Sequence, residues 1–208
     1  MQMNGAIGGF YKVCDWLMKL AYINILWIAL TLSGLIIFGI FPATTAMFVI
    51  IRKTLMDKDE IPITKTFWES YKSEFFKSNL LGLVLIISGY ILFINIQFLS
   101  NSTGLINLLY YPTLMIALGY ILTLFYVFPT FVHFELRIHQ IIKHAFLIML
   151  MNPLSTILMV IGTFAVYLLM TTIPGLIPLF SASILSLVIM WASFFAFSKI
   201  KRQQDAAA

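Results

Sequence analysis

Charged residues are scarce in this chain, and they are absent from its longest segments. Only 10% of the residues are Asp, Glu, Lys or Arg, whereas soluble domains contain about 25%. Residues 20–51, 78–132 and 145–198 contain neither a charged residue nor a histidine. Proton pumps and ion-coupled transporters commonly place ionisable groups at membrane depth. The sequence therefore argues against those classes of membrane protein.

Motifs of reaction chemistry are also missing. The sequence has no P-loop, no nucleophile elbow and no HExxH motif. Cys14 is the one cysteine, which excludes an internal disulfide and a site built of thiolates. His133, His139 and His144 are six and five residues apart, unlike the i, i+3 or i, i+4 pairs that bind a metal from one helix face. We predict a protein that is not an enzyme, without catalytic residues, metal or cofactor.

What the chain does have is long apolar sequence, with 61% hydrophobic residues. As one helix, residues 78–132 would be about 82 Å long, but the hydrocarbon core of a bilayer is about 30 Å thick. Such runs must fold back, and the polar, glycine-containing segments 100–104 and 171–175 are the expected turns. We predict an all-α integral membrane helical bundle, one domain over residues 1–208. Its five expected spans are residues 20–41, 80–99, 108–131, 154–170 and 176–197.

The first apolar run is longer than one span needs. Pro42 removes a backbone donor and crowds the preceding turn, so it is expected to break the run. Residues 42–55 are then a second helical piece that ends near Arg52 and Lys53. The sequence does not show whether this piece re-enters the membrane.

Two charged connectors separate the spans, at residues 52–77 and 133–152. Both have apolar or aromatic residues at helical spacing, which predicts amphipathic helices at the membrane surface. Acidic residues alternate with the basic ones in the first connector, which argues against nucleic acid as a partner. Because the basic residues lie in the connectors and at the C-terminus, the positive-inside rule places these in the cytoplasm. Five spans then put the N-terminus outside; re-entry of residues 42–55 would put it inside.

Amide side chains within the predicted spans are candidate intramembrane sites. Asn24, Asn95 and Gln97 either line a path for a sugar, whose hydroxyls amides can bind, or form hydrogen bonds between helices. The second explanation is favoured.

Two further sets of residues are candidates for contacts. On the last span, Ala182, Ser186 and Ser193 form a stripe of small residues, which favours close helix packing within the bundle or against a second protein. The polar residues of the second connector are candidates for contact with a partner or form only a surface helix. These residues are Glu135, Arg137, His139, Lys143 and His144.

Three segments together resemble a known family. They are residues 23–53, 67–82 and 125–155. Their most specific parts are Asn24, Trp27, the sequence PATTA at residues 42–46, and residues 145–153. They are similar to the YesL-like family of small bacterial multi-span membrane proteins of unknown function. Members are commonly encoded beside carbohydrate ABC importers. The resemblance implies location in the bacterial plasma membrane and supplies no catalytic residues.

The function predicted on this basis is a non-enzymatic accessory or assembly partner of a carbohydrate ABC import system. Membrane lipid and the permease or solute-binding subunits are the expected partners, and the oligomeric state is open. In and just after the second connector, the residues Glu135, Ala145 and Pro153 resemble the coupling helix of ABC permeases, although its glycine and first alanines are lacking. The alternative function is a small facilitator or channel for a neutral solute such as a sugar.

Overall fold

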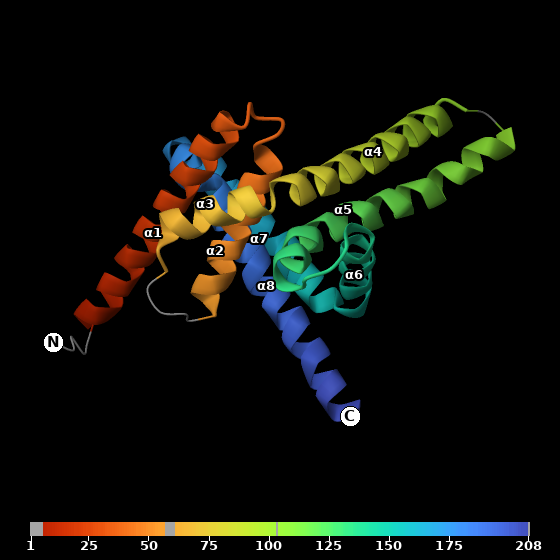
Figure 1. The fold of residues 1–208 in the computed structure, drawn as a ribbon. Helices are drawn as coiled ribbons and strands as arrows, with labels where there is room; N and C mark the ends of the chain where they lie inside the picture. Colours follow the sequence, from red (N-terminus) through yellow and green to blue (C-terminus); the bar gives the residue numbers. More distant parts are fainter. Residues whose placement is uncertain (1–5, 57–60, 103, 208) are drawn as a thin grey trace.

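The protein is an all-α bundle (Figure 1). The computed structural model describes residues 6–56, 61–102 and 104–207, and these contain no strand. Five helical segments are long and apolar enough to cross a membrane, which confirms the predicted fold class. The helices are α1 (Ala6–Ser33), α2 (Ile40–Leu55), α3 (Ile63–Ser73), α4 (Phe75–Ser100), α5 (Tyr110–His133), α6 (Ile138–Met151), α7 (Pro153–Thr172) and α8 (Ile177–Ala207).

The two predicted turns form at the polar breaks. The first joins α4 to α5 and includes the short 3₁₀ helix η1 (Gly104–Leu109). The second joins α7 to α8 through η2 (Pro174–Leu176). The chargeless runs at residues 78–132 and 145–198 therefore each form a helical hairpin, as their lengths require.

The break in the first apolar run lies earlier than predicted. Helix α1 ends at Ser33 and a turn covers residues 34–39, so the span expected at residues 20–41 is shorter at its end. Leu35 and Ile36 adopt left-handed backbone conformations, with φ of 56° and 63°. Pro42 lies in the first turn of α2, where helices tolerate proline because no backbone donor is needed there. The prediction that Pro42 breaks the run is wrong.

Helix α2 is the centre of the bundle. It contacts α1, α3, α4, α5 and α8, and half of its 16 residues are buried. Ala43, Ala46 and Ile50 have no exposed surface. The small alanine side chains let neighbouring helices approach closely, as is usual in membrane bundles. The part of the first apolar run that one span does not need, residues 42–55, therefore belongs to the helix on which five others pack.

Both α2 and α8 run antiparallel to α1. Thr44, near the start of α2, bonds to Trp27, while Leu55 at its end shares a small cavity with Trp16. Helix α8 bonds to Asn24 near its start, and farther along it Trp191 lines the same small cavity as Trp16. The start of α1 and the end of α8 therefore lie at the same end of the bundle (Figure 1). The predicted N-outside, C-inside arrangement does not fit this pairing, because α2 folds back along α1.

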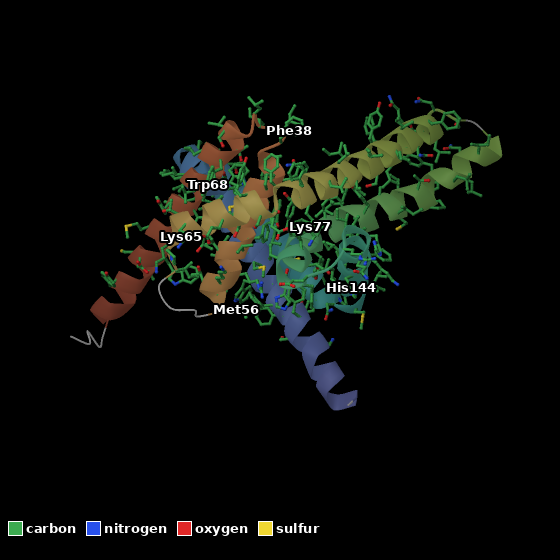
Figure 2. The ribbon with its side chains drawn as sticks, viewed as in Figure 1. Phe38, Met56, Lys65, Trp68, Lys77 and His144 are labelled. Atoms are coloured by element: carbon green, nitrogen blue, oxygen red, sulfur yellow. The ribbon has the colours of Figure 1, made fainter. Side chains whose placement is uncertain are left out.

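The predicted surface helices pack on this core. Helix α3 returns along α2 and buries Phe67 and Tyr71, whereas Trp68 is exposed. Helix α6 packs on α5 and buries Ile141 and Ala145. In Figure 2, Lys65 and Trp68 mark α3, and His144 marks α6 beside the base of the α4–α5 hairpin.

Candidate functional site

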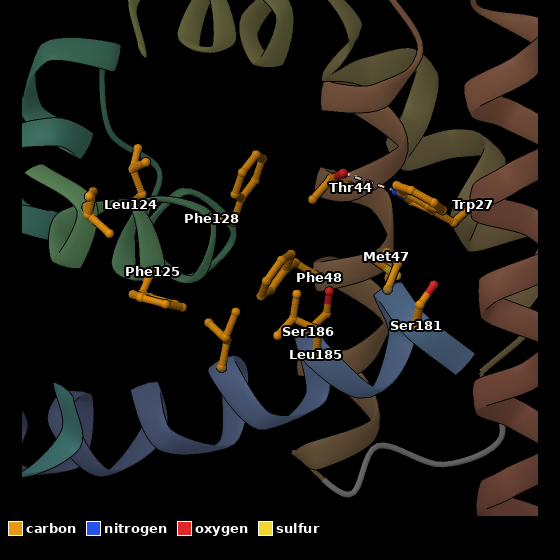
Figure 3. A pocket seen from close by; sticks show the side chains of 13 residues that line it. Trp27, Thr44, Met47, Phe48, Leu124, Phe125, Phe128, Ser181, Leu185 and Ser186 are labelled. Carbon is orange, nitrogen blue, oxygen red and sulfur yellow. Dashed lines mark hydrogen bonds between the residues drawn. The ribbon is translucent and has the colours of Figure 1, made fainter. Parts of the chain in front are cut away.

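An open, mostly apolar groove of about 510 Å³ lies between α1, α2, α5 and α8 and is here called the α2 groove (Figure 3). This volume is within the range of about 300–1,000 Å³ that is usual for small-molecule sites. Three hydroxyls and one indole are the polar groups of its lining. The lining residues are Trp27, Thr44, Met47, Phe48, Ile121, Leu124, Phe125, Phe128, Ser181, Ala182, Leu185, Ser186 and Ile189.

Contacts between helices fix the two ends of the α2 groove. At one end the Trp27 indole donates a hydrogen bond to the Thr44 hydroxyl at 3.0 Å, and Thr44 in turn donates to the carbonyl of Ile40 at 2.6 Å. At the other end the rings of Phe48 and Phe128 are stacked, with centroids 5.7 Å apart. The indole and hydroxyl already satisfy each other, so the groove favours an apolar occupant.

Asn24 joins α1 to the start of α8. Its amide group donates to the carbonyl of Pro178 at 2.8 Å and accepts from the backbone N–H groups of Ala182 and Ser183, each at 3.1 Å. The side chain is completely buried. Pro178 and Ala182 are four residues apart, so Asn24 contacts both members of a pair that an α-helix would bond directly. Asn24 therefore forms hydrogen bonds between helices, the favoured explanation.

The structure does not bring the other two candidate amides to Asn24. Asn95 and Gln97 lie on the outer part of α4 and are exposed. Asn95 bonds to the Ile91 carbonyl of its own helix at 2.8 Å, and Gln97 lines a shallow depression with Phe98 and Asn101. The three amides do not form one polar path.

The small-residue stripe of α8 faces the bundle. Ala182 and Ser186 line the α2 groove. Ser193 is completely buried, and its hydroxyl donates to the carbonyl of Ile189 at 2.8 Å. These residues lie where α8 approaches α1 and α2, and they leave room for the groove.

The candidate partner-contact residues lie close together on the surface. They occupy the segment before α6 and its first turns, and all five side chains are exposed: Glu135, Arg137, His139, Lys143 and His144. The backbone N–H of Arg137 donates to the side chain of Gln140 at 3.0 Å, which helps to fix the start of α6. The surface combines two cations and two imidazoles with one carboxylate.

The three histidines do not converge. His133 stacks on Phe197 with ring centroids 4.5 Å apart and contacts Phe134 and Phe194 edge-on, whereas His139 and His144 are exposed on α6. Within the described ranges, no three His, Cys, Asp or Glu side chains lie near enough to share a metal ion. The absence of a metal site remains a prediction for the whole chain.

Sequence reasoning missed the role of Arg52. Its guanidinium donates to the Val132 carbonyl at the end of α5, where the helix dipole is negative. Arg52 is one turn beyond Phe48 on α2, and Val132 is one turn beyond Phe128 on α5. The sequence does show that Phe48 and Arg52 are four residues apart, which puts them on one face of a helix. It does not show that this face pairs with α5.

Comparisons with known proteins place the chain in a family. A family model described as "Protein of unknown function, DUF624" matches residues 20–96. Three proteins of Bacillus subtilis (strain 168) are similar: the uncharacterized protein YteU is 39% identical over 186 residues, covering 89% of this chain and 84% of that protein. For the uncharacterized protein YesV, identity is 38% over 198 residues, or 95% of each chain. For the uncharacterized protein YesL, identity is 31% over 207 residues, covering 99% of this chain and 97% of that protein.

No solved structure matches the chain. The identities extend over nearly its whole length and include helices outside the matched family model, such as α8. On this evidence the chain belongs to the YesL-like family of multi-span membrane proteins, which carries the DUF624 domain.

Proposed function

We propose that this protein is a non-enzymatic membrane partner of a carbohydrate ABC import system and binds the permease through helix contacts. The main support is the α4–α5 hairpin, which projects to one side of the bundle (Figure 1). Its outer part exposes large apolar side chains on both helices. Tyr90, Phe93, Phe98, Tyr111 and Met115 are each more than 60% exposed.

The exposed amide of Asn95 on this hairpin indicates that a partner helix, and not lipid alone, packs beside the hairpin. Asn95 lies within an apolar span, and among the described residues its one hydrogen bond is to its own helix. Polar side chains in such spans usually face other helices, where they bond across the interface. A partner helix packed along α4 would supply acceptors and donors that lipid tails lack.

The exposed surface at the start of α6 is the second proposed contact. Lys143 and His144 are exposed, while Ile141 and Ala145 fix the helix against α5. A rigid helix that presents charges beside the membrane suits contact with a soluble subunit or with the cytoplasmic part of a permease. The identity of the ABC partner rests on the family resemblance and on its typical gene neighbours.

The alternative, a facilitator for a neutral solute, requires a polar path between the two faces. The α2 groove is mostly apolar, and the buried amide of Asn24 is bonded to the backbone of α8. These observations favour the partner proposal. Uptake of a sugar into liposomes by the purified protein alone would support the facilitator instead.

Replacing Asn95 by leucine is expected to weaken co-purification of the permease without affecting the fold. One lost hydrogen bond between membrane helices corresponds to about 0.6–1.7 kcal/mol, or a roughly threefold to twentyfold loss in affinity. The measurement is quantitative pull-down of the co-expressed permease from detergent extracts.

The matched control is Asn101→Leu. Asn101 also bonds to its own helix, at the Gln97 carbonyl at 2.8 Å, but it lies in the turn after α4. Its replacement should leave the pull-down unchanged. Equal recovery of the permease with all three proteins would contradict a contact along α4.

We infer that the end of the bundle with both the start of α1 and the end of α8 faces the cytoplasm. Lys19, Arg52, Lys53 and Lys199 lie toward that end, as the positive-inside rule favours. Cys14 is exposed there and is the one thiol. A membrane-impermeant maleimide should label it only after spheroplasts are lysed. Labelling of intact spheroplasts would place the N-terminus outside.

A further inference from the structure

The Phe48–Phe128 end of the α2 groove leads to a cation. On α2, Arg52 lies one turn beyond Phe48, and on α5, Val132 lies one turn beyond Phe128; the two are joined by the hydrogen bond from the guanidinium to the carbonyl. On α8, the buried Ser193 lies one turn beyond the lining residue Ile189. Three helices that line the groove therefore continue past its lined part, and Arg52 lies on this continuation.

This cation keeps free hydrogen-bonding capacity. A guanidinium has five N–H donors, and the bond to Val132 uses one. Its Nε–H finds no acceptor in the described part of the chain. Among the same residues, the one ion pair is Lys19 with Asp15, so no described carboxylate neutralises Arg52.

A second cation lies at the same helix end. The ammonium group of Lys77 is 5.0 Å from the centre of the ring of Phe131, the residue before Val132. Figure 2 labels Lys77 near the start of α4. Like Arg52, Lys77 makes no described ion pair. Two cations without a described acidic partner thus lie at the end of α5, beyond the lined part of the groove.

We propose that the α2 groove binds an anionic phospholipid, with an acyl chain in the groove and the phosphate at Arg52 and Lys77. Lipid tails surround the spanning helices that form its walls, and the groove offers them an apolar lining. On α2 the lining runs from Thr44 to Phe48, and Arg52 follows one turn later, about 12 Å from Thr44 along the helix. An extended acyl chain can cover that distance from the groove to a phosphate at Arg52. Basic pockets between membrane helices commonly bind anionic headgroups. This inference is independent of the proposed ABC partner.

The test measures which lipid lies beside Trp27 in vesicles. Trp16, Trp68 and Trp191 are replaced by phenylalanine, so that Trp27 in the groove is the one tryptophan left to report quenching. Phosphatidylglycerol or phosphatidylcholine brominated in the acyl chains is mixed with its unbrominated counterpart. We expect phosphatidylglycerol to be preferred at Trp27 about fivefold or more, from one or two basic groups near the headgroup.

Variants separate the headgroup contact from the groove. Arg52→Gln should remove most of the preference, whereas Arg52→Lys should keep it because the charge remains. Lys77→Gln should reduce the preference in part. Because this variant leaves the Arg52–Val132 bond intact, it still tests the proposal if Arg52→Gln fails to fold. The matched control Lys143→Gln removes an exposed cation on α6 and should leave the preference unchanged. Ala182→Phe fills the groove and should reduce quenching by both lipids.

Equal quenching by the two lipids in the parent protein would overturn the proposal. So would an undiminished preference in both Arg52→Gln and Lys77→Gln. Quenching by neither lipid, together with a dimer detected by cross-linking in the vesicles, would mean that a second copy of the chain fills the groove, and would also overturn it.

Discussion

Replacing Asn24 by leucine is expected to lower the free energy of unfolding by about 2–3 kcal/mol. The substitution keeps a similar side-chain volume but leaves the Pro178 carbonyl and the N–H groups of Ala182 and Ser183 without the partner that now binds them. Each buried polar group that loses its partner costs about 1–3 kcal/mol in water-soluble proteins, and helix-to-helix bonds in membranes average about 0.6 kcal/mol. The thermal midpoint in detergent should fall by about 4–12 °C.

Asn95→Leu is the matched control for stability. It is the same chemical change in another span, but the Asn95 side chain is exposed and bonds only within α4. Its midpoint should stay within about 2 °C of the parent protein. Equal midpoints for the two variants, measured by fluorescence-detected unfolding in one detergent, would show that the contact between α1 and α8 does not depend on Asn24.

The long spans could be predicted because their cause is local. A chargeless run too long for one crossing has to fold back, and the polar residues near Asn101 and Gly175 supply the turns. The amphipathic helices of the connectors follow from residue spacing in the same way. None of these features depends on which helix packs against which.

The break in the first apolar run was predicted at Pro42, but the turn lies before that residue. Pro42 is the stronger helix breaker in a general sense, but proline is harmless in the first turn of a helix. The real turn places Leu35 and Ile36 in left-handed conformations that side chains with a Cβ seldom adopt. Nothing in the residues themselves favours that conformation, so the packing of α2 against α1 must impose it.

The candidate sites show the same limit. Asn24, Asn95 and Gln97 are all amide side chains within predicted apolar spans. Asn24 is nevertheless buried in a contact between helices, whereas the other two are exposed. Arg52 looked like the flank of a helix, but its carbonyl acceptor is 80 residues away in sequence. Such roles depend on long-range pairing, which hydropathy and spacing do not encode.

Replacing Gly39 by alanine is expected to destabilise the protein strongly, although it adds only one methyl group. An added Cβ would lie 2.4 Å from the carbonyl oxygen of Thr31 and 2.9 Å from that of Leu30. Both atoms belong to the backbone of α1, so no side-chain rotation can relieve the overlap. The backbone of Gly39 is ordinary, with φ of −88°, and the requirement for glycine is one of space alone.

The turn that would have to open is also the turn that holds α2, the central helix, against α1. Overpacking in a core typically costs about 1–3 kcal/mol, and a clash between backbones should reach the upper part of that range. We expect Gly39→Ala to lower the thermal midpoint by about 6 °C or more, or to prevent accumulation of folded protein.

Gly119→Ala is the control that separates space from helix propensity. Gly119 lies inside α5, and an added Cβ would meet no atom within 4 Å. Alanine is favoured over glycine inside a helix by about 1 kcal/mol, so this variant should be as stable as the parent protein or slightly more so. Fluorescence-detected size exclusion and thermal unfolding measure both variants. If Gly39→Ala matched Gly119→Ala in yield and midpoint, α1 and α2 would not approach each other as closely as the structure requires.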